Sequence, residues 1–323
     1  MLRVAIAGTF TASLEQPLRR CLFEPCDIVV SDEAGIAALM ADVDVLLTMV
    51  FTQEMGRRAT RLKLVQVAGA GLDRIDRAAL PAGTALANVY GHETGIAEYA
   101  IGAMLALTRE FTRLDAALRQ GSWLSQWAVG AAVPALWPEL ARKTLGLLGY
   151  GRIGRNIARR ALAFDMAVCA VRRHAAEPAD RGVALLGGPE MMDEVLRRAD
   201  YVVIAMPATA ETKGAIARRE LALMKPTAFL VNVARAEIVD EASLFDALAE
   251  RVIAGAALDV WYRYPSEARP TPPATRPFHE LPNVLMTPHV AGWTDGMLDA
   301  RAGLIAENIR RIEHGEPVLN LVP

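Results

Sequence analysis

The sequence predicts an α/β protein built from two doubly wound parallel sheets, one in each of two domains. Short, wholly apolar runs alternate with longer segments of helical period, which is typical of strands covered by helices on both faces. These runs fall into two groups along the chain. A length of 323 residues with 53% hydrophobic content also exceeds what one core usually absorbs, which favours two domains.

The predicted strands follow from the apolar runs. The first group is LRVAIAG, DIVV, VDVLLT and LVQVA, and the second is TLGLLG, MAVCAV, YVVIAM, AFLVNV, AGAALDV and VLMT. A long amphipathic segment from about residue 94 to 120 predicts a helix that leaves the first domain, and a second long helix at about 296–314 would carry the chain back. We therefore expect a discontinuous first domain, residues 1–94 plus 296–323, and a second domain, residues 95–295.

Composition excludes several classes of function. The formal net charge is -2 with no basic stripe, and no run of about 18 apolar residues occurs, so we expect neither nucleic acid nor a membrane as partner. The opening MLRVAIAGTF indicates a first strand and not a signal peptide. Cys21, Cys26 and Cys169 fit neither a disulfide framework nor a metal site, which predicts reduced thiols, a cytoplasmic location and no metal. Small molecules and a second copy of the chain are the expected partners.

The strongest local motif is TLGLLGYGRIGRNIARRAL, in which Gly149, Gly151 and Gly154 form GxGxxG between a predicted strand and helix. Gly149 would permit the tight turn, Gly151 the approach of a pyrophosphate, and Gly154 close helix packing. The motif predicts a Rossmann-like, dinucleotide-binding second domain. The alternative is a tight strand-to-helix turn that binds no ligand.

The next strand, MAVCAV, ends in Arg172, Arg173 and His174, where an NAD-binding domain would carry an acidic residue for the ribose hydroxyls. Two guanidinium groups can clamp a 2'-phosphate that a carboxylate would repel. The sequence therefore predicts NADP, with NAD possible and a solvated basic turn as the alternative.

Two titratable or charged residues follow strands that are otherwise apolar. Arg235 in FLVNVARAEIVDEASL can fork to the carboxylate and oxo group of a 2-oxo acid. His289 in NVLMTPHVAGWT is suited to exchange a proton near neutral pH. Taken singly, each has a structural alternative, a helix-capping arginine or a histidine bonded to backbone. Because ligands gather at the carboxyl ends of parallel strands, the two together predict a site.

The motifs quoted above are joined by five further segments, VAGAGLDRID, IAEYAIGAML, LRQGSW, MPATAETKGAI and AALDVW. Together they cover most of residues 62 to 295. The sequence thereby resembles the D-isomer-specific 2-hydroxyacid dehydrogenases, and glyoxylate or hydroxypyruvate reductases in particular. The resemblance implies an oxidoreductase that moves a hydride between NADP(H) and a small 2-hydroxy or 2-oxo acid. It also implies that the first domain binds the substrate, that the active site lies in the cleft between the domains, and that the protein is a homodimer with residues 123–137 at or near the interface.

The resemblance further implies roles for individual residues. Arg235 and His289 would act in catalysis, and the backbone NH groups of Ala68, Gly69 and Ala70 would bind the substrate carboxylate. The cofactor-binding residues that it implies are Gly149, Gly151, Arg152, Ile153, Gly154, Arg172, Arg173, Pro207, Thr212, Val233 and Asp259, of which Asp259 would face the nicotinamide.

The chain departs from the family pattern at the residue that supports the catalytic histidine. The family has a glutamate five residues after the aspartate of LDV, whereas DVWYRYP places Tyr264 there, and a neutral phenol cannot stabilise an imidazolium as a carboxylate does. We count Tyr264 among the catalytic residues. Glu267 would replace the carboxylate only if the loop bulges, and the register opposes this.

Two alternative functions remain open at this point. Formate dehydrogenases of the wider family also lack the glutamate, since they transfer a hydride without a proton, but their asparagine is replaced here by His92, which we place among the substrate-binding residues. A nucleotide-sensing relative without enzymatic activity is the other alternative, and retention of Arg235 and His289 argues against it. The identity of the acid and the physiological direction stay open, although NADP favours reduction.

Overall fold

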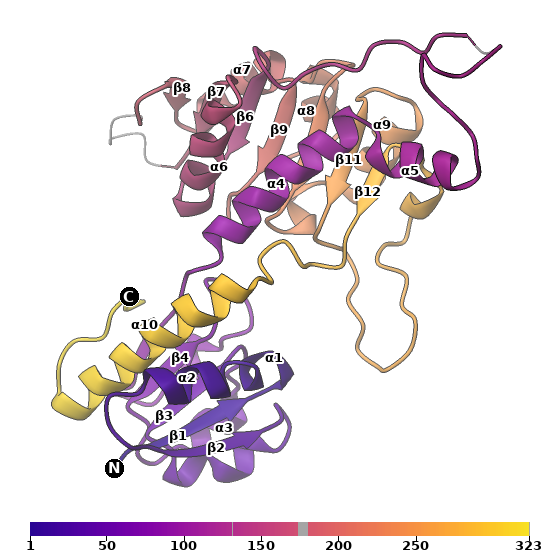
Figure 1. Ribbon diagram of the computed structural model, residues 1–323. Coiled ribbons are helices and arrows are strands. Elements are labelled where there is room, and N and C mark those ends of the chain that lie inside the picture. The colour runs from indigo at the N-terminus through magenta and orange to yellow at the C-terminus, as the bar shows by residue number, and fades with distance from the viewer. Residues whose placement is uncertain (131, 174–179, 323) are drawn as a thin grey trace. The chain divides into compact units, whose positions relative to one another are not determined.

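The computed structural model describes residues 1–130, 132–173 and 180–322, so His174 lies outside the described residues. The chain divides into two compact units (Figure 1). The first comprises Met1–His92 and Trp293–Pro323, and the second comprises Glu93–Gly292. The sequence had predicted breaks after residues 94 and 295.

The first unit is a parallel sheet with helices, in the order β2-β1-β3-β4-β5 among the residues described. Its strands are β1 (Arg3–Ala7), β2 (Asp27–Ser31), β3 (Val45–Thr48), β4 (Leu64–Val67) and β5 (Ala85–Ala87). Its helices are α1 (Thr9–Ala12), α2 (Glu15–Cys21), α3 (Gln53–Arg58) and α10 (Asp295–His314), with 3-10 turns at Ile36–Asp42 and Arg77–Ala79. Figure 1 shows α10 in yellow beside α2, and its Ile305 and Ile309 belong to the same apolar core as Val4 and Ile6.

The second unit contains the longer sheet, also parallel, in the order β12-β11-β10-β9-β6-β7-β8 for the described part of the chain. Its strands are β6 (Thr144–Leu148), β7 (Ala167–Val171), β8 (Val183–Gly187), β9 (Tyr201–Ile204), β10 (Phe229–Asn232), β11 (Gly255–Leu258) and β12 (Val284–Met286). Its helices are α4 (Glu93–Thr108), α5 (Phe111–Arg119), α6 (Arg152–Ala163), α7 (Met192–Arg198), α8 (Arg218–Leu223) and α9 (Glu241–Ala249), with 3-10 turns at Pro189–Met191, Ala236–Ile238 and Phe278–Glu280.

The strand order of the second unit contains a switch point at β6. The chain continues from β6 to β7 on one side, and β9 pairs with the other side of β6. Ligands of open parallel sheets bind at the carboxyl ends of the strands beside such a point. The predicted fold class, two doubly wound parallel sheets, is confirmed.

Three elements differ from the sequence prediction. The single helix expected over about 94–120 is two helices, α4 and α5, because Glu110 between them has a left-handed backbone with φ of 50°. The strands β5 and β8 were not predicted, since β5 has only three residues and β8 lies at the sheet edge, where burial is incomplete.

No helix in the described residues is long and apolar enough to cross a membrane.

Candidate active site

The glycine loop after β6 fits a dinucleotide better than it fits an empty turn. Gly149 has φ of +109°, and a Cβ there would lie 2.5 Å from the backbone nitrogen of Met206. A Cβ on Gly154 would lie 2.2 Å from the carbonyl oxygen of Gly149. Packing therefore explains these two glycines, whereas a Cβ on Gly151 would meet nothing within 4 Å, and its φ of -93° needs no glycine. The open space at Gly151 is what the approach of a pyrophosphate requires.

The start of α6 also suits a phosphate. Gly151 is the N-cap and supplies no side chain to the first turn, which begins with Arg152 and Ile153. The backbone NH groups of a helix's first turn have no partner within the helix, and the helix dipole there favours an anion. These residues would hold the pyrophosphate of a bound dinucleotide.

The loops after β9 and β10 lie at the same end of the sheet as the glycine loop, because the carboxyl ends of the parallel neighbours β6, β9 and β10 point the same way. Thr212 donates its Oγ1 hydrogen to the carbonyl oxygen of Pro207 at 2.7 Å and accepts from the backbone NH of Thr209 at 2.7 Å. Val233 is buried directly after β10. The structure thus brings Pro207, Thr212 and Val233 to the carboxyl ends of the strands, where a dinucleotide would lie.

Arg172 and Arg173 directly follow β7, as predicted for a group that meets the adenosine end of the cofactor. The backbone NH of Arg172 donates to the carbonyl oxygen of Gly187 at 3.0 Å, which places it beside β8, and Arg173 is exposed. Sequence reasoning missed a carboxylate here. Asp180 accepts from Tyr150 Oη at 2.6 Å and from Arg155 Nη1 at 2.6 Å. The Tyr150 hydrogen bond, with Arg155 and the charge of Arg172, lowers the pKa of Asp180, so a negative charge lies near Arg172.

Arg235 is held in a turn that begins at the end of β10. The amide of Asn232, the last residue of this strand, donates to the carbonyl oxygen of Arg235 at 3.0 Å and accepts from the backbone NH of Ala234 at 3.1 Å. The guanidinium Nη1 donates to the carbonyl oxygen of Ala234 at 2.8 Å. Asn232, which is buried, was not singled out in the sequence, although a polar residue that ends an apolar strand is a detectable signal.

The loop that carries His289 is anchored by Asp259. This carboxylate directly follows β11 and is 1% exposed. Its Oδ1 accepts from Thr287 Oγ1 at 2.6 Å and from the backbone NH of Val290 at 2.9 Å, and its Oδ2 accepts from the backbone NH of Ala291 at 2.9 Å. His289 lies between these bonds with a left-handed φ of 58°, which is unusual for a residue other than glycine. Both oxygens of Asp259 therefore hold the loop of His289, and the implied position of this residue facing the nicotinamide stays a prediction.

Tyr264 lies beside the histidine. Its Oη is 2.7 Å from His289 Nδ1 and also accepts from the backbone NH of Trp261 at 3.3 Å. Burial raises the pKa of Tyr264, so the phenol is neutral near pH 7. The other carboxylate considered, Glu267, is exposed and pairs with Arg269 at 3.1 Å.

The charges around His289 act in opposite directions. Loss of hydration lowers the pKa of His289 most, the negative charge of Asp259 raises it, and the positive charge of Arg235 lowers it further. Because Arg235 affects the ring in this way, the guanidinium and the imidazole belong to one electrostatic site. The net direction is a histidine that binds its proton less readily than usual.

Two further residues support the histidine loop and were missed from the sequence. The hydroxyl oxygen Oη of Tyr99 in α4 lies 2.7 Å from Thr287 Oγ1, and Trp261 Nε1 donates to the carbonyl oxygen of Thr287 at 2.8 Å. Since the hydroxyl of Thr287 donates to Asp259, Tyr99 is the donor to Thr287. Burial raises the pKa of Tyr99 to about 12, which keeps it a donor. No local periodicity in the sequence marks these contacts.

In the first unit, the loop after β4 carries the residues predicted to bind the carboxylate. Ala68 is fully buried and its backbone NH donates to the carbonyl oxygen of Thr48 at 3.0 Å, continuing the sheet. The prediction that its NH group binds substrate is therefore wrong, because the pairing with the neighbouring strand continues one residue beyond the end of β4 at Val67 and engages this NH group. The carbonyl oxygens of Gly69 and Ala70 accept from Val89 N at 3.2 Å and Asn88 Nδ2 at 3.0 Å, so their turn is held in place. Gly69 and Ala70 remain candidates.

His92 ends the first unit's main segment. Its Nδ1 lies 2.9 Å from Nη2 of Arg301 in α10. The structure thus pairs this predicted substrate-binding residue with a cation that the sequence did not single out.

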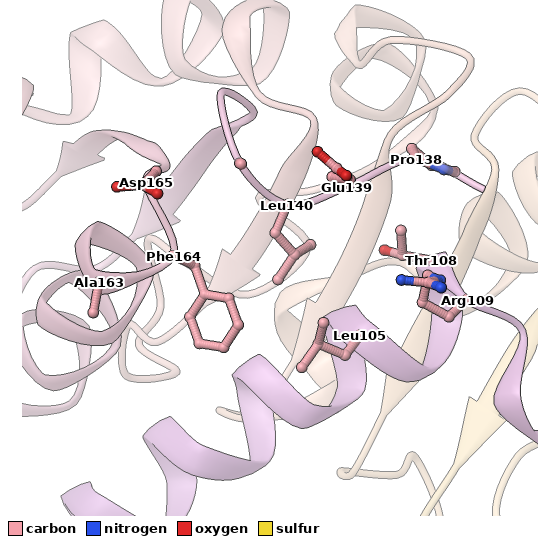
Figure 2. Close-up of a pocket in the computed structure, with 10 residues that line it drawn as sticks. Leu105, Thr108, Arg109, Pro138, Glu139, Leu140, Ala163, Phe164 and Asp165 are labelled. Carbon is pink, nitrogen blue, oxygen red and sulfur yellow. The ribbon is translucent and has the colours of Figure 1, made fainter. Parts of the chain in front are cut away.

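A pocket of 310 Å³ opens at the other end of α6 (Figure 2). Leu105, Leu140 and Phe164 line it, with Thr108 and Asp165 also at its wall. The glycine loop precedes the first residue of α6, whereas Phe164 follows the last, and twelve helical residues span about 18 Å. This pocket is therefore separate from the dinucleotide site.

The parallel sheet with a switch point, the glycine loop, the arginine after β10 and the histidine after β12 define a dinucleotide-dependent oxidoreductase. The family model described as D-isomer specific 2-hydroxyacid dehydrogenase, NAD binding domain, matches residues 101–291. The chain belongs to the D-isomer-specific 2-hydroxyacid dehydrogenase family.

Its relatives include reductases and dehydrogenases. The chain is 36% identical over 280 residues to a glyoxylate reductase of Pyrococcus furiosus, covering 85% of this chain and 81% of that one. It is 34% identical over 289 residues to a D-3-phosphoglycerate dehydrogenase of Methanocaldococcus jannaschii, covering 87% of this chain but only 52% of that longer protein. A solved NADPH-dependent glyoxylate/hydroxypyruvate reductase of Sinorhizobium meliloti, in complex with NADP and malonate, superimposes with a TM-score of 0.78 at 28% identity, covering 99% of this chain and 96% of that one. The predictions of family, oxidoreductase activity and use of NADP or NAD are confirmed.

Proposed function

We propose that the protein reduces a small 2-oxo acid, of the size of glyoxylate or hydroxypyruvate, and that it uses NADPH in preference to NADH. The observation that carries this proposal is the grouping of Arg235, Asp259 and His289 at the carboxyl ends of the neighbouring strands β10, β11 and β12. A 2-oxo acid offers the carboxylate and oxo oxygens that a guanidinium binds in a forked geometry. The names of the relatives above support the same substrate class.

The residues divide the reaction between them. The bound nicotinamide would supply a hydride to the carbonyl carbon. Arg235 binds the carboxylate and polarises the oxo group, and His289 gives a proton to the carbonyl oxygen. Because Tyr264 occupies Nδ1 of the ring, Nε2 is the nitrogen that exchanges this proton. When the ring is protonated, its Nδ1–H donates to the phenol oxygen of Tyr264.

The first unit contributes binding groups in this proposal. Gly69 and Ala70 offer backbone NH groups to the substrate carboxylate, and His92 offers a ring NH. The basic pair Arg172 and Arg173 favours the 2'-phosphate of NADPH over the hydroxyl of NADH. The nearby Asp180 opposes this preference, so its size depends on the balance of these charges.

We also propose a cytoplasmic homodimer. Exposed apolar side chains cluster on α5 and the segment after it, namely Phe111, Leu118, Trp123, Trp127 and Leu136. A second copy of the chain would remove this surface from water. The three cysteines, which form no disulfide with one another, suit a reducing compartment. Light scattering coupled to gel filtration would contradict the dimer if it returned the mass of one chain.

The experiment that tests the catalytic proposal measures NADPH oxidation with glyoxylate, hydroxypyruvate and bulkier 2-oxo acids. We expect turnover with at least one small acid, and a loss on the order of 10² to 10⁴ in kcat for His289→Ala, because positioned proton transfer contributes that much. An inactive natural protein, or an unimpaired His289→Ala, would refute the proposal.

The missing family glutamate favours a second candidate, formate-type hydride transfer without proton exchange. This reaction needs no general acid, so His289→Ala would leave a large share of its activity. Oxidation of formate with NADP or NAD, measured beside the reductions above, separates the two reactions.

A further inference from the structure

Arg301 is a buried cation in the first unit. It lies in α10 and is only 6% exposed, next to the apolar face formed by Ala302, Ile305 and Ala306. Two other arginines of this helix, Arg310 and Arg311, instead pair with Glu307 near the surface. Burying a guanidinium is costly unless it is hydrogen-bonded, so its partners indicate why it is there.

The partners of Arg301 lie in the loop after β5. Its Nε donates to the carbonyl oxygen of Tyr90 at 3.3 Å, and its Nη2 lies 2.9 Å from Nδ1 of His92. Gly91 between them has φ of +102°, and a Cβ there would lie 2.9 Å from Cβ of Ala300. The loop therefore packs directly on the turn of α10 that carries Arg301.

An aromatic ring completes the setting. The guanidinium carbon lies 5.5 Å from the ring centre of Phe10, which in turn packs at 5.5 Å on the ring of Trp293. A guanidinium above an aromatic face is held by cation–π attraction. Arg301 is thus held from two sides, by the loop that carries His92 and by the ring of Phe10.

The chemistry of this pair determines where the proton of His92 lies. A guanidinium donates hydrogen bonds, accepts none and stays charged, so Nδ1 of His92 must accept. The proton of the neutral ring is then on Nε2. A second proton would bring an imidazolium against the guanidinium, and like charges at this distance repel.

We propose that Arg301 is a positioning residue that fixes His92 as a neutral Nε2–H donor aimed at an oxygen of an anionic 2-oxo acid. This inference rests on the proposed function for the contact between His92 and substrate. It gives the two histidines different tasks, since His289 exchanges a proton with the substrate, whereas His92 keeps its proton and only binds.

The first test is the tautomer of His92 in the natural protein. The chain has five histidines, so ¹⁵N labelling of histidine gives a small set of ring signals, and His92→Gln identifies the one that is lost. We expect the Nε2–H tautomer for His92. An Nδ1–H tautomer or an imidazolium near neutral pH would overturn the proposal without touching the assignment of His289 and Arg235.

The second test compares Arg301→Met with Arg311→Met, a control of the same chemical change on the same helix. Arg301→Met should give mixed tautomers of His92 and a KM for the 2-oxo acid about 3- to 10-fold higher, with kcat nearly unchanged, because a binding hydrogen bond is misplaced. Arg311→Met should leave the His92 ring signals and KM as they are. Arg301→Lys, which keeps a buried donor, should preserve the Nε2–H tautomer with a smaller rise in KM.

The outcomes separate the inference from the proposed function. Unchanged ring signals in Arg301→Met would show that Arg301 does not fix His92. Another outcome is the expected Nε2–H tautomer in the natural protein and the expected mixture in Arg301→Met, with KM unchanged in both Arg301→Met and His92→Gln. That result would refute the contact between His92 and substrate. Should Arg301→Met not fold, Arg301→Lys and the ring signals of the natural protein still decide the question.

Discussion

The substitution Tyr264→Glu tests how His289 holds its proton. In the natural protein a neutral phenol lies 2.7 Å from Nδ1, while loss of hydration lowers the pKa of His289. Reduction needs the protonated ring, so kcat/KM for a 2-oxo acid should fall as the pH rises through this lowered pKa. A carboxylate at position 264 favours the imidazolium and should move that fall to higher pH.

The size of the shift can be worked from the geometry. A glutamate is shorter than a tyrosine, so the carboxylate would lie about 5 Å from the ring, where two unit charges attract by about 3 kcal/mol at an effective dielectric constant of about 20. Tyr264 is 51% exposed, and exposed ion pairs contribute about 0 to 1 kcal/mol. Between these limits we expect about 1.4 kcal/mol, which is one pKa unit. One pH unit above the natural midpoint, the protonated fraction and hence the relative kcat/KM should rise about fivefold.

The assay is the pH dependence of kcat/KM for NADPH-dependent reduction by the natural protein and its variants. Tyr264→Gln is the matched control, because it has the shape of glutamate without the charge, and its profile should not move upward. Coincident normalised profiles of the natural protein and Tyr264→Glu would refute the electrostatic argument, even if both enzymes are active.

Two further predictions concern the cofactor and the substrate carboxylate. Replacing Arg172 by Ala and Arg173 by Asp should reverse a preference for NADPH over NADH in direct binding measurements. The variant Asp180→Asn should instead strengthen NADPH binding more than NADH binding, because it removes a negative charge near the expected site of the 2'-phosphate. Equal affinities of the natural protein for both cofactors would contradict this prediction. Arg235→Ala should raise KM and lower kcat, and Arg235→Lys should recover only part of the loss, since lysine lacks the fork. Unchanged steady-state kinetics of Arg235→Ala with an active 2-oxo acid would remove this residue from the site.

The sequence by itself determined the fold class and the kind of chemistry. Its apolar runs are long enough to identify ten of the strands by position, because strands buried on both faces must be apolar throughout. The motif around Gly149 and the polar residues Arg235 and His289 stand out for the same reason, since they interrupt or end apolar strands. The departure at Tyr264 was visible too, because it is a matter of spacing from Asp259 along one loop.

Only the tertiary structure decided what these residues contact. Asp259 holds the loop of His289 through bonds to residues 28 to 32 positions away, and Arg301 reaches His92 across 209 positions. Ala68 lost its predicted role because its NH group pairs with a neighbouring strand. Such contacts depend on strand register and on how a helix packs against a loop, and neither leaves a periodic pattern in the chain. Local sequence therefore placed the reactive groups, and packing over long separations set their orientation and charge.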